Sequence, residues 1–226
     1  MSVVFWDFDG TLAWSLHLWS GSGYKALLET DPNTTVTYEQ LDPHFHGGFT
    51  WHTPFEDYTS YKGDKWWEYM NRRFYQNYVN SGVDEVTAKA AAEKMREIIK
   101  RVENYNLYED AVDALTKTAA MGHKNILLSN NYPDMDEVLQ KLGIYHLFDG
   151  TVVSAVEGYD KPRRELFELA KKRYPADRHY MVGDNAVADI GGAGAVGMTT
   201  VLVHRGYNED ADYCFDNLLS VCDIIK

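Results

Sequence analysis

The fold is decided by one stretch near the N-terminus, which reads SVVFWDFDGT over residues 2–11. Its first half, Ser2–Trp6, is a short apolar run of the kind that forms a buried strand. Asp7 and Asp9 follow at once, and Gly10 then favours a turn. Two carboxylates directly after a buried strand are costly unless a cation joins them. The stretch therefore predicts a functional site at the end of the first strand, and the alternative is an ordinary Asp-Gly turn.

From about residue 104 onward, the sequence predicts strands that alternate with helices. The strands are expected at 125–129, 151–154, 179–182 and 199–203, and the helices at 109–121, 134–142, 163–173 and 189–195. Such alternation is typical of a parallel sheet with helices on both faces. We therefore predict an α/β fold with a Rossmann-like parallel sheet.

The segment between residues 14 and 103 has a different texture. It contains every tryptophan except Trp6 and many tyrosines, and it lacks the alternation typical of strands. Helices are expected at 61–78 and 83–102, after a loop at 42–61 that Pro and Gly break repeatedly. We therefore predict a helical domain of residues 14–103, inserted into an α/β core domain made of residues 1–13 and 104–226.

Polar groups follow three of the predicted strands, and a lysine precedes a helix. These residues are Asp7, Asp9, Ser129, Asn130, Asp184 and Lys161. Since the carboxyl ends of parallel strands share one edge of the sheet, the groups can converge there. Carboxylate oxygens suit Mg²⁺, and a lysine with a hydroxyl suits phosphate oxygens. Taken singly, Ser129 could be a helix-capping hydroxyl and Lys161 a solvated surface lysine; their order and placement together favour a site.

These residues resemble the four motifs of the haloacid dehalogenase superfamily, in its phosphatase branch. The matching segments are Asp7-Phe8-Asp9-Gly10-Thr11, Leu127-Leu128-Ser129-Asn130, Lys161-Pro162 and the run from Gly183 to Asp189. They occur in the family's order and cover residues 1–13 and about 104–205. The insert is placed like the family's helical cap, although no motif within it matches. The resemblance thus implies the same α/β core with a cap.

The resemblance also implies a role for each acid. Asp7 would be the nucleophile that forms an aspartyl-phosphate, and it would bind Mg²⁺ together with Asp184 and the backbone carbonyl of Asp9. The Asp9 side chain would act as general acid and then as general base. A phosphate ester needs such a proton donor because its alcohol leaves as an alkoxide, whereas a halide leaves without a proton.

Other residues would hold the phosphoryl group or support the site. By resemblance, Ser129, the Asn130 backbone and Lys161 would bind phosphoryl oxygens. Asp189 would support the metal ligands or orient Lys161, and Thr11 would have a supporting role.

Two residues of the insert, His52 and Lys62, are candidates for contact with substrate. The loop around His52 is dense in histidines and aromatic residues, which could stack on a sugar or base or bind a second anion. The alternative is that these aromatic side chains pack the insert's own small core. His44 and His46 lack the further ligands that a metal would need.

Charge and composition exclude several classes of partner. The formal net charge of −12 disfavours polymeric nucleic acid as a ligand. No apolar run is long enough to span a membrane, and the N-terminus lacks the pattern of a signal peptide, so we expect a cytoplasmic protein. Cys214 and Cys222 form neither a disulfide framework nor a zinc site. We expect Mg²⁺ as cofactor, a small phosphorylated metabolite as substrate, and a monomer or homodimer.

Three functions remain open on the sequence. The leading one is a Mg²⁺-dependent phosphatase that hydrolyses a small-molecule phosphomonoester. A phosphomutase would use the same aspartyl-phosphate but would transfer phosphate instead of releasing it. A non-catalytic binding protein on this fold would usually lack Asp7, Asp9 or Asp184, and all three are present.

Overall fold

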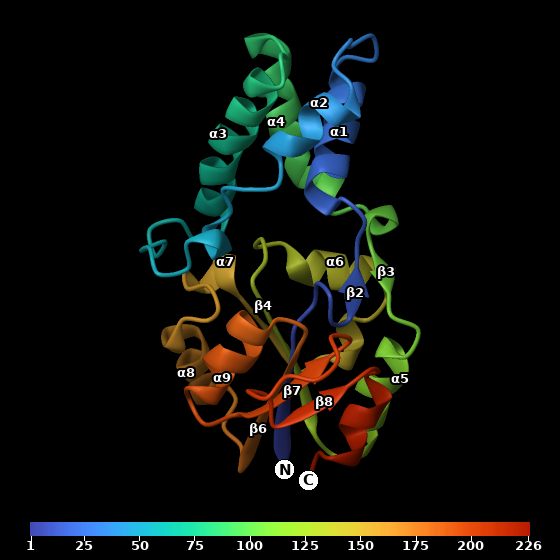
Figure 1. Ribbon diagram of the computed structural model, residues 1–226, viewed down its shortest axis with the longest axis vertical. Helices are drawn as coiled ribbons and strands as arrows, with labels where there is room; N and C mark the ends of the chain where they lie inside the picture. The colour runs from blue at the N-terminus through green and yellow to red at the C-terminus, as the bar shows by residue number, and fades with distance from the viewer.

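A six-stranded sheet lies at the centre of the protein in a computed structural model that describes residues 1–226 (Figure 1). The strand order is β5-β4-β1-β6-β7-β8, and every neighbouring pair is parallel. The strands are β1 (Ser2–Trp6), β4 (Lys124–Ser129), β5 (Gly150–Val153), β6 (Arg178–Gly183), β7 (Thr199–Val203) and β8 (Tyr213–Phe215). This confirms the predicted α/β class and adds β8, which the sequence did not predict.

Helices cover both faces of the sheet, as predicted. Along β1, Val3 and Phe5 belong to one buried cluster, whereas Val4 and Trp6 belong to the other. This alternation follows from the two-residue period of a strand, with both faces buried. Helices α5 (Ala111–Ala120) and α6 (Met135–Lys141) pack on the side of Trp6, and α8 (Arg164–Arg173) and α9 (Gly192–Gly194) pack on the side of Phe5. The short helix α7 (Ser154–Glu157) follows β5.

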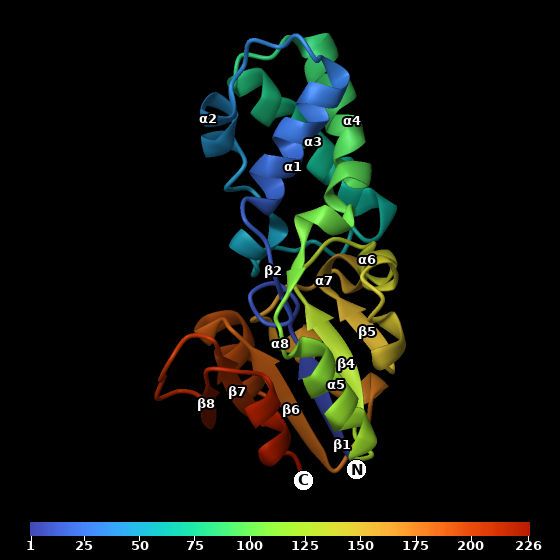
Figure 2. The ribbon, with the colours of Figure 1, turned by 90° about the vertical axis from the view of Figure 1, so that its right-hand side faces the viewer.

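Four helices form a separate layer beyond the carboxyl ends of the strands, and we call residues 18–99 the helical unit (Figures 1 and 2). They are α1 (Leu18–Thr30), α2 (Tyr38–Leu41), α3 (Asp64–Asn80) and α4 (Glu85–Ile99). Helices α1 and α3 both pack against α4. The buried hydroxyl of Tyr78 on α3 donates a hydrogen bond to the Gly23 carbonyl oxygen on α1 at 2.7 Å, which ties these two helices together.

Helix α1 was not predicted, because the first half of its sequence is poor in helix-forming residues. It contains Ser20-Gly21-Ser22-Gly23, and both residue types favour other conformations. A Cβ atom at Gly23 would lie 2.8 Å from the Phe45 ring. The glycine therefore permits close packing, and tertiary contacts stabilise a helix that the local sequence does not favour.

Two short strands connect the helical unit to the sheet. β2 (Ala13–Trp14) leads into the unit and β3 (Asn106–Leu107) leads out of it. They pair antiparallel, with Ala13 opposite Leu107. The two crossings of the chain therefore lie side by side.

Polar contacts also join the helical unit to the core on the side of α6 and α7. The Arg96 guanidinium on α4 donates to the Asp134 carboxylate at 2.7 Å, and the Gly63 amide donates to the Ala155 carbonyl oxygen at 2.9 Å. The unit is thus held over the carboxyl edge of the sheet from one side as well as through β2 and β3.

Several predicted boundaries differ from the observed ones for local reasons. Helix α3 begins at Asp64 because Gly63 has a positive φ of 58°, and α4 begins after Asp84, whose carboxylate accepts from the Val86 and Thr87 amides at 3.1 Å. The segment predicted as a helix over 189–195 is a π-helical turn, Ala186–Gly191, followed by α9. The predicted loop at 42–61 contains two 3₁₀ turns, Asp42–His44 and Thr50–His52. A third lies at Val102–Asn104, a fourth at Tyr145–Leu147 and a fifth at Leu219–Asp223.

None of the helices combines the length and the apolar character that crossing a membrane requires. Both cysteines are free; Cys222 is buried and Cys214 is half-buried.

Candidate active site

Asp7 occupies the centre of the carboxyl edge of the sheet. It follows β1, which lies between β4 and β6, and its amide continues the ladder by donating to the Val182 carbonyl oxygen at 2.9 Å. Only 7% of Asp7 is exposed, and its Oδ1 accepts a hydrogen bond from Lys161 Nζ at 2.8 Å. The register of three strands thus fixes one carboxylate at the mouth of the site.

Lys161 is the buried cation of the site, with 2% of the residue exposed. Its Nζ donates to Asp7 Oδ1 at 2.8 Å, to Asp189 Oδ1 at 2.6 Å and to the Leu128 carbonyl oxygen at 3.1 Å. Burial alone would lower the pKa of Lys161, but the charges of Asp189 and Asp7 raise it above its ordinary value. The ammonium group is therefore permanently charged, and all three of its protons are engaged.

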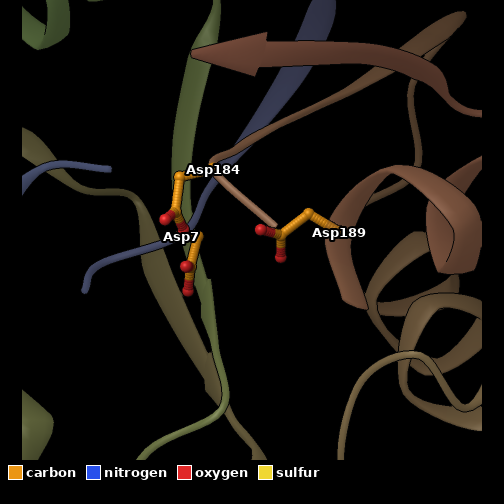
Figure 3. A group of neighbouring side chains, drawn as sticks. All are labelled: Asp7, Asp184 and Asp189. Atoms are coloured by element: carbon orange, nitrogen blue, oxygen red, sulfur yellow. The ribbon is translucent and has the colours of Figure 1, made fainter. Parts of the chain in front are cut away.

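Two further carboxylates approach Asp7 from the segment after β6. Figure 3 shows Asp7, Asp184 and Asp189 gathered beside one another, and a carboxylate oxygen from each lies within 4.8 Å of the others. Burial, and then the charge of Asp7, raises the pKa of Asp184. Burial also raises the pKa of Asp189, against the opposing effect of Lys161. If all three carboxyl groups are ionised, the single charge of Lys161 leaves negative charge that a metal ion would neutralise.

Asp189 differs from the other two acids because both of its oxygens already have partners. Oδ1 accepts from Lys161 Nζ at 2.6 Å, and Oδ2 accepts from the Asn185 amide at 3.0 Å. Asp189 therefore orients Lys161, which is one of the two roles that the family resemblance implies for it. Asp7 and Asp184 each keep an oxygen free of protein donors and are the better candidates for metal ligands.

Asp9 lies next to this cluster and is held by a residue that the sequence did not single out. Its Oδ2 accepts a hydrogen bond from Asn131 Nδ2 at 2.7 Å. Burial, and then the neighbouring charge of Asp7, raises the pKa of Asp9 to about 7. A carboxyl group with this pKa can both give and take a proton near neutral pH, which is the property of a general acid–base group.

Two buried hydroxyls near the acids have no hydrogen-bond partner. They belong to Ser129 at the end of β4 and to Thr11 in the loop after β1, which are 1% and 0% exposed. Buried polar groups normally have partners, so an unpaired one needs a reason. The Ser129 hydroxyl faces the cavity described next, and a ligand oxygen there would satisfy it.

A cavity of about 440 Å³ brings most of the predicted residues together. Its lining includes Asp7, Asp9, Ser129, Asn130, Lys161, Asp184 and Asp189 from the core and His52 from the helical unit. The Asn130 side chain accepts from the Lys161 amide at 2.6 Å and donates to the Lys161 carbonyl oxygen at 3.0 Å, so it fixes the lysine's backbone. A larger cavity of about 660 Å³ between α3 and α4 contains none of these groups.

The two candidates from the helical unit are placed differently. His52 lines the cavity, and its partial burial lowers its pKa. Lys62 does not line the cavity; its Nζ lies 5.8 Å from the centre of the Tyr159 ring. The structure therefore brings His52 to the site and leaves Lys62 outside it.

Arg205 was also missed by the sequence reading. It follows β7, and its Nε and Nη2 donate to Asp184 Oδ2 at 3.1 and 2.5 Å. Together with Lys161 it partly balances the acids. The oxygens that remain free to bind a metal ion belong to Asp7 and Asp184. This set of ligands contains only oxygen atoms and is net acidic, so it fits a hard divalent cation such as Mg²⁺.

Comparison with known proteins places the chain among hydrolases. A family model described as haloacid dehalogenase-like hydrolase matches residues 1–197. The chain is 35% identical over 109 residues to a glyceraldehyde 3-phosphate phosphatase of Methanopyrus kandleri, which covers 46% of each chain. It is 32% identical over 126 residues to a phosphoserine phosphatase of Thermus thermophilus, covering 53% of this chain and 51% of that protein. The matches thus span about half the length of these relatives.

Solved structures resemble the whole chain at lower identity. A phosphatase of this class from Thermococcus onnurineus matches with a TM-score of 0.70 at 20% identity, covering 99% of this chain and 97% of the other. A 2-haloacid dehalogenase from Pseudomonas syringae matches with the same TM-score, identity and coverage. Because a phosphatase and a dehalogenase fit equally well, this likeness shows the fold alone and leaves the chemistry to the site residues.

Proposed function

The chain belongs to the haloacid dehalogenase-like hydrolases, and from this premise we propose that it is a Mg²⁺-dependent phosphatase acting on a small phosphomonoester. The observation that carries the proposal is the Asp9 carboxyl group. It lines the cavity together with Asp7, the Asn131 amide holds it there at 2.7 Å, and burial raises its pKa above the ordinary value. Hydrolysis of a phosphate ester needs a proton donor for the leaving alcohol at this place, and loss of a halide does not.

In the first step, an Asp7 carboxylate oxygen attacks the phosphorus atom. A bond forms between this oxygen and phosphorus, and the bond from phosphorus to the ester oxygen breaks. Asp9, held by Asn131, donates its proton to the departing ester oxygen, which leaves as an alcohol. The Ser129 hydroxyl donates to a phosphoryl oxygen, and the Lys161 charge stabilises the negative charge on the group.

The second step reverses the role of Asp9. As a carboxylate, it takes a proton from a water molecule, whose oxygen attacks the phosphorus of the aspartyl-phosphate. Inorganic phosphate leaves, and the Asp7 carboxylate and the protonated Asp9 are restored. When bound by Asp7, Asp184 and the Asp9 carbonyl oxygen, Mg²⁺ supplies positive charge that neutralises the acids and the phosphoryl oxygens.

We propose that the helical unit serves as a cap, and that the cap domain spans residues 14–103. It contributes His52 and Trp51 to the cavity, opposite the acids of the core. Closing such a layer over the site would exclude water and select the alcohol part of the substrate. A small phosphorylated metabolite fits a cavity of this size.

The direct test compares the natural protein with Asp7→Asn. With saturating Mg²⁺, the natural protein should release inorganic phosphate from 4-nitrophenyl phosphate, and Asp7→Asn should lower kcat by about 10⁴-fold or more. Asp177→Asn, an exposed acid that contacts only the N-terminus, is the matched control and should keep full activity. Full activity of Asp7→Asn, or transfer of phosphate to an added alcohol without release, would contradict the proposal.

A further inference from the structure

A second cavity adjoins the site on the side of Asp9. It has a volume of about 570 Å³ and shares four lining residues with the first cavity, namely Asp9, Trp51, Asn130 and Asp184. Ser129 and Lys161, which would bind the phosphoryl group, line only the first cavity. Under the proposed function, Asp9 protonates the ester oxygen, so it marks the border between the phosphoryl group and the alcohol. The second cavity would then hold the alcohol part of the substrate.

The wall of the second cavity is largely aromatic. Its apolar members are Trp14, Leu18, Trp19, Trp51 and Tyr108. They come from β2, from α1, from the 3₁₀ turn at 50–52 and from the segment after β3, so the fold brings them together from distant parts of the chain. Indole and phenol faces attract flat rings through dispersion and through the edge-to-face or offset arrangement of their π-systems.

The tryptophans are held in place by their neighbours. The Trp51 ring stacks on Phe49 with the ring centres 4.8 Å apart, and it lies 5.9 Å from the ring of Trp19. Trp14 is 39% exposed and packs less tightly. A ligand ring that enters this cavity would therefore contact two tryptophans held by their neighbours, Trp19 and Trp51. It would also contact the indole of Trp14, which is more accessible.

Charge in the same cavity argues against a second anionic group on the substrate. Arg205 is its only positively charged lining residue, and the structure pairs its guanidinium with Asp184. The remaining charged groups, Asp9 and Asp184, are acids. The Ser15 hydroxyl, a potential donor to a sugar, already donates to the Asn104 carbonyl oxygen at 2.6 Å.

We propose that the substrate is a phosphate monoester whose alcohol carries a flat aromatic ring, and that this ring binds against Trp14, Trp19 and Trp51. The inference rests on the proposed phosphatase function and narrows its substrate class. It predicts that bisphosphates are poor substrates, because the second cavity offers their second phosphate no free cation, and that small polyol phosphates are poor substrates, because they have no ring to bind the wall.

The test uses two esters that differ in the ring and little in the leaving alcohol. Benzyl phosphate and cyclohexylmethyl phosphate both release a primary alcohol, so the chemical step is closely matched. We expect kcat/KM with Mg²⁺ to be at least about fivefold higher for the benzyl ester, and higher than for glycerol 3-phosphate. Trp14→Leu should lower the ratio of kcat/KM for the two ring esters, because it removes one of the three indoles that contact the ring. Tyr145→Leu, which removes an equally exposed aromatic side chain outside the cavity, should leave the ratio unchanged.

The outcomes separate the inference from the function on which it rests. Equal kcat/KM for the two ring esters, or a preference for glycerol 3-phosphate, would overturn the inference and leave the phosphatase standing. If no ester is hydrolysed, the phosphatase proposal fails. Binding of benzylphosphonate and cyclohexylmethylphosphonate to the natural protein, measured calorimetrically with Mg²⁺, then decides the inference. Tighter binding of the benzyl compound, with a smaller difference in Trp14→Leu, supports the inference, and equal or undetectable binding of both compounds overturns it.

Discussion

The carboxyl edge of the sheet and the aromatic wall of the second cavity face the same site, but they are positioned by different means. At the sheet edge, Asp7 and Lys161 are almost fully buried, and backbone ladders and ion pairs fix each charged group. In the wall, Trp51 and Trp19 are only half-buried, and ring packing holds them. Charges held in this way cannot move without a large cost, whereas packed rings can be exchanged for others of similar volume.

The difference suggests that the sheet edge and the aromatic wall have separate roles in the reaction. The sheet edge carries the steps that every phosphate ester requires, and the wall carries the choice among esters. Substitutions at the edge should therefore affect all substrates or the stability of the whole protein. Substitutions in the wall should alter the ranking of substrates.

The largest effect in the comparison is expected for Asp9→Asn. Loss of the proton donor should lower kcat/KM for benzyl phosphate, which reports formation of the aspartyl-phosphate and not its later hydrolysis, by about 10²–10⁴-fold. The loss should be clearly smaller for 4-nitrophenyl phosphate, because nitrophenolate leaves readily without a proton. Steady-state kinetics with the two esters measures both values. An equal loss for both esters would show that Asp9 does not act as the acid.

Two buried lysines, Lys161 at the sheet edge and Lys100 directly after α4, test how strongly stability depends on a buried charge. Lys161→Met leaves Asp7 and Asp189 without their cation in the interior, so it should lower the free energy of unfolding by about 3–5 kcal/mol. Lys100→Met should cost about 1 kcal/mol or less, because the side chains of its partners Glu97 and Glu137 are 71% and 41% exposed. Urea unfolding of both variants without Mg²⁺ gives the comparison. Equal losses of unfolding free energy in the two variants would contradict this expectation.

The pH dependence of stability tests whether the charge of Asp9 at the sheet edge destabilises the folded protein. In the folded protein without Mg²⁺, burial and Asp7 raise the pKa of Asp9 to about 7, against an ordinary value of 3.8. Between these values the folded state binds more protons than the unfolded state, so the contribution of Asp9 to stability falls as pH rises and is lowest above 7. Asp9→Asn should therefore be progressively more stable than the natural protein as pH rises from 5 to 8, as measured by Tm. A Tm difference that does not change with pH would refute the assignment.

The smallest expected effect concerns Arg205. Its guanidinium donates to Asp184 Oδ2 and adds positive charge beside the expected metal ligands. Arg205→Gln should therefore tighten Mg²⁺ binding, as measured by calorimetry, and by no more than about fivefold because the Arg205 side chain is 57% exposed and its charge is screened by solvent. Arg101→Gln, which breaks an exposed pair with Glu29 in the helical unit, is the control and should leave the affinity unchanged. Weaker Mg²⁺ binding in Arg205→Gln would mean that the arginine holds Asp184 in place.

The sequence predicted the sheet edge well because strand ends leave strong local signals. Asp7 follows an uninterrupted apolar run, and Asp184 follows a second buried strand. The parallel order then requires both to lie at one edge. The reading missed Asn131 and Arg205, since each acts through a side-chain direction that no local pattern encodes. Arg205 contacts Asp184 across 21 residues, after His204 turns the chain with a positive φ of 63°.

The helical unit was predicted only in part, because packing decides much of its structure. The periodic segments of α3 and α4 were recognised within a few residues. Helix α1 was missed because its serines and glycines disfavour a helix locally, while Gly23 permits the close approach of Phe45. The distinction between His52, which reaches the cavity, and Lys62, which does not, likewise depends on the path of the loop.

The pairing of β2 with β3 has a consequence for how such a protein can diversify. Because Ala13 lies opposite Leu107, everything between them is attached through two neighbouring points on the core. A segment attached in this way can be lengthened, shortened or replaced during evolution while the strands on either side keep their register. Grafting the intervening segment of a relative between Ala13 and Leu107 should therefore transfer substrate preference without rebuilding the acid cluster.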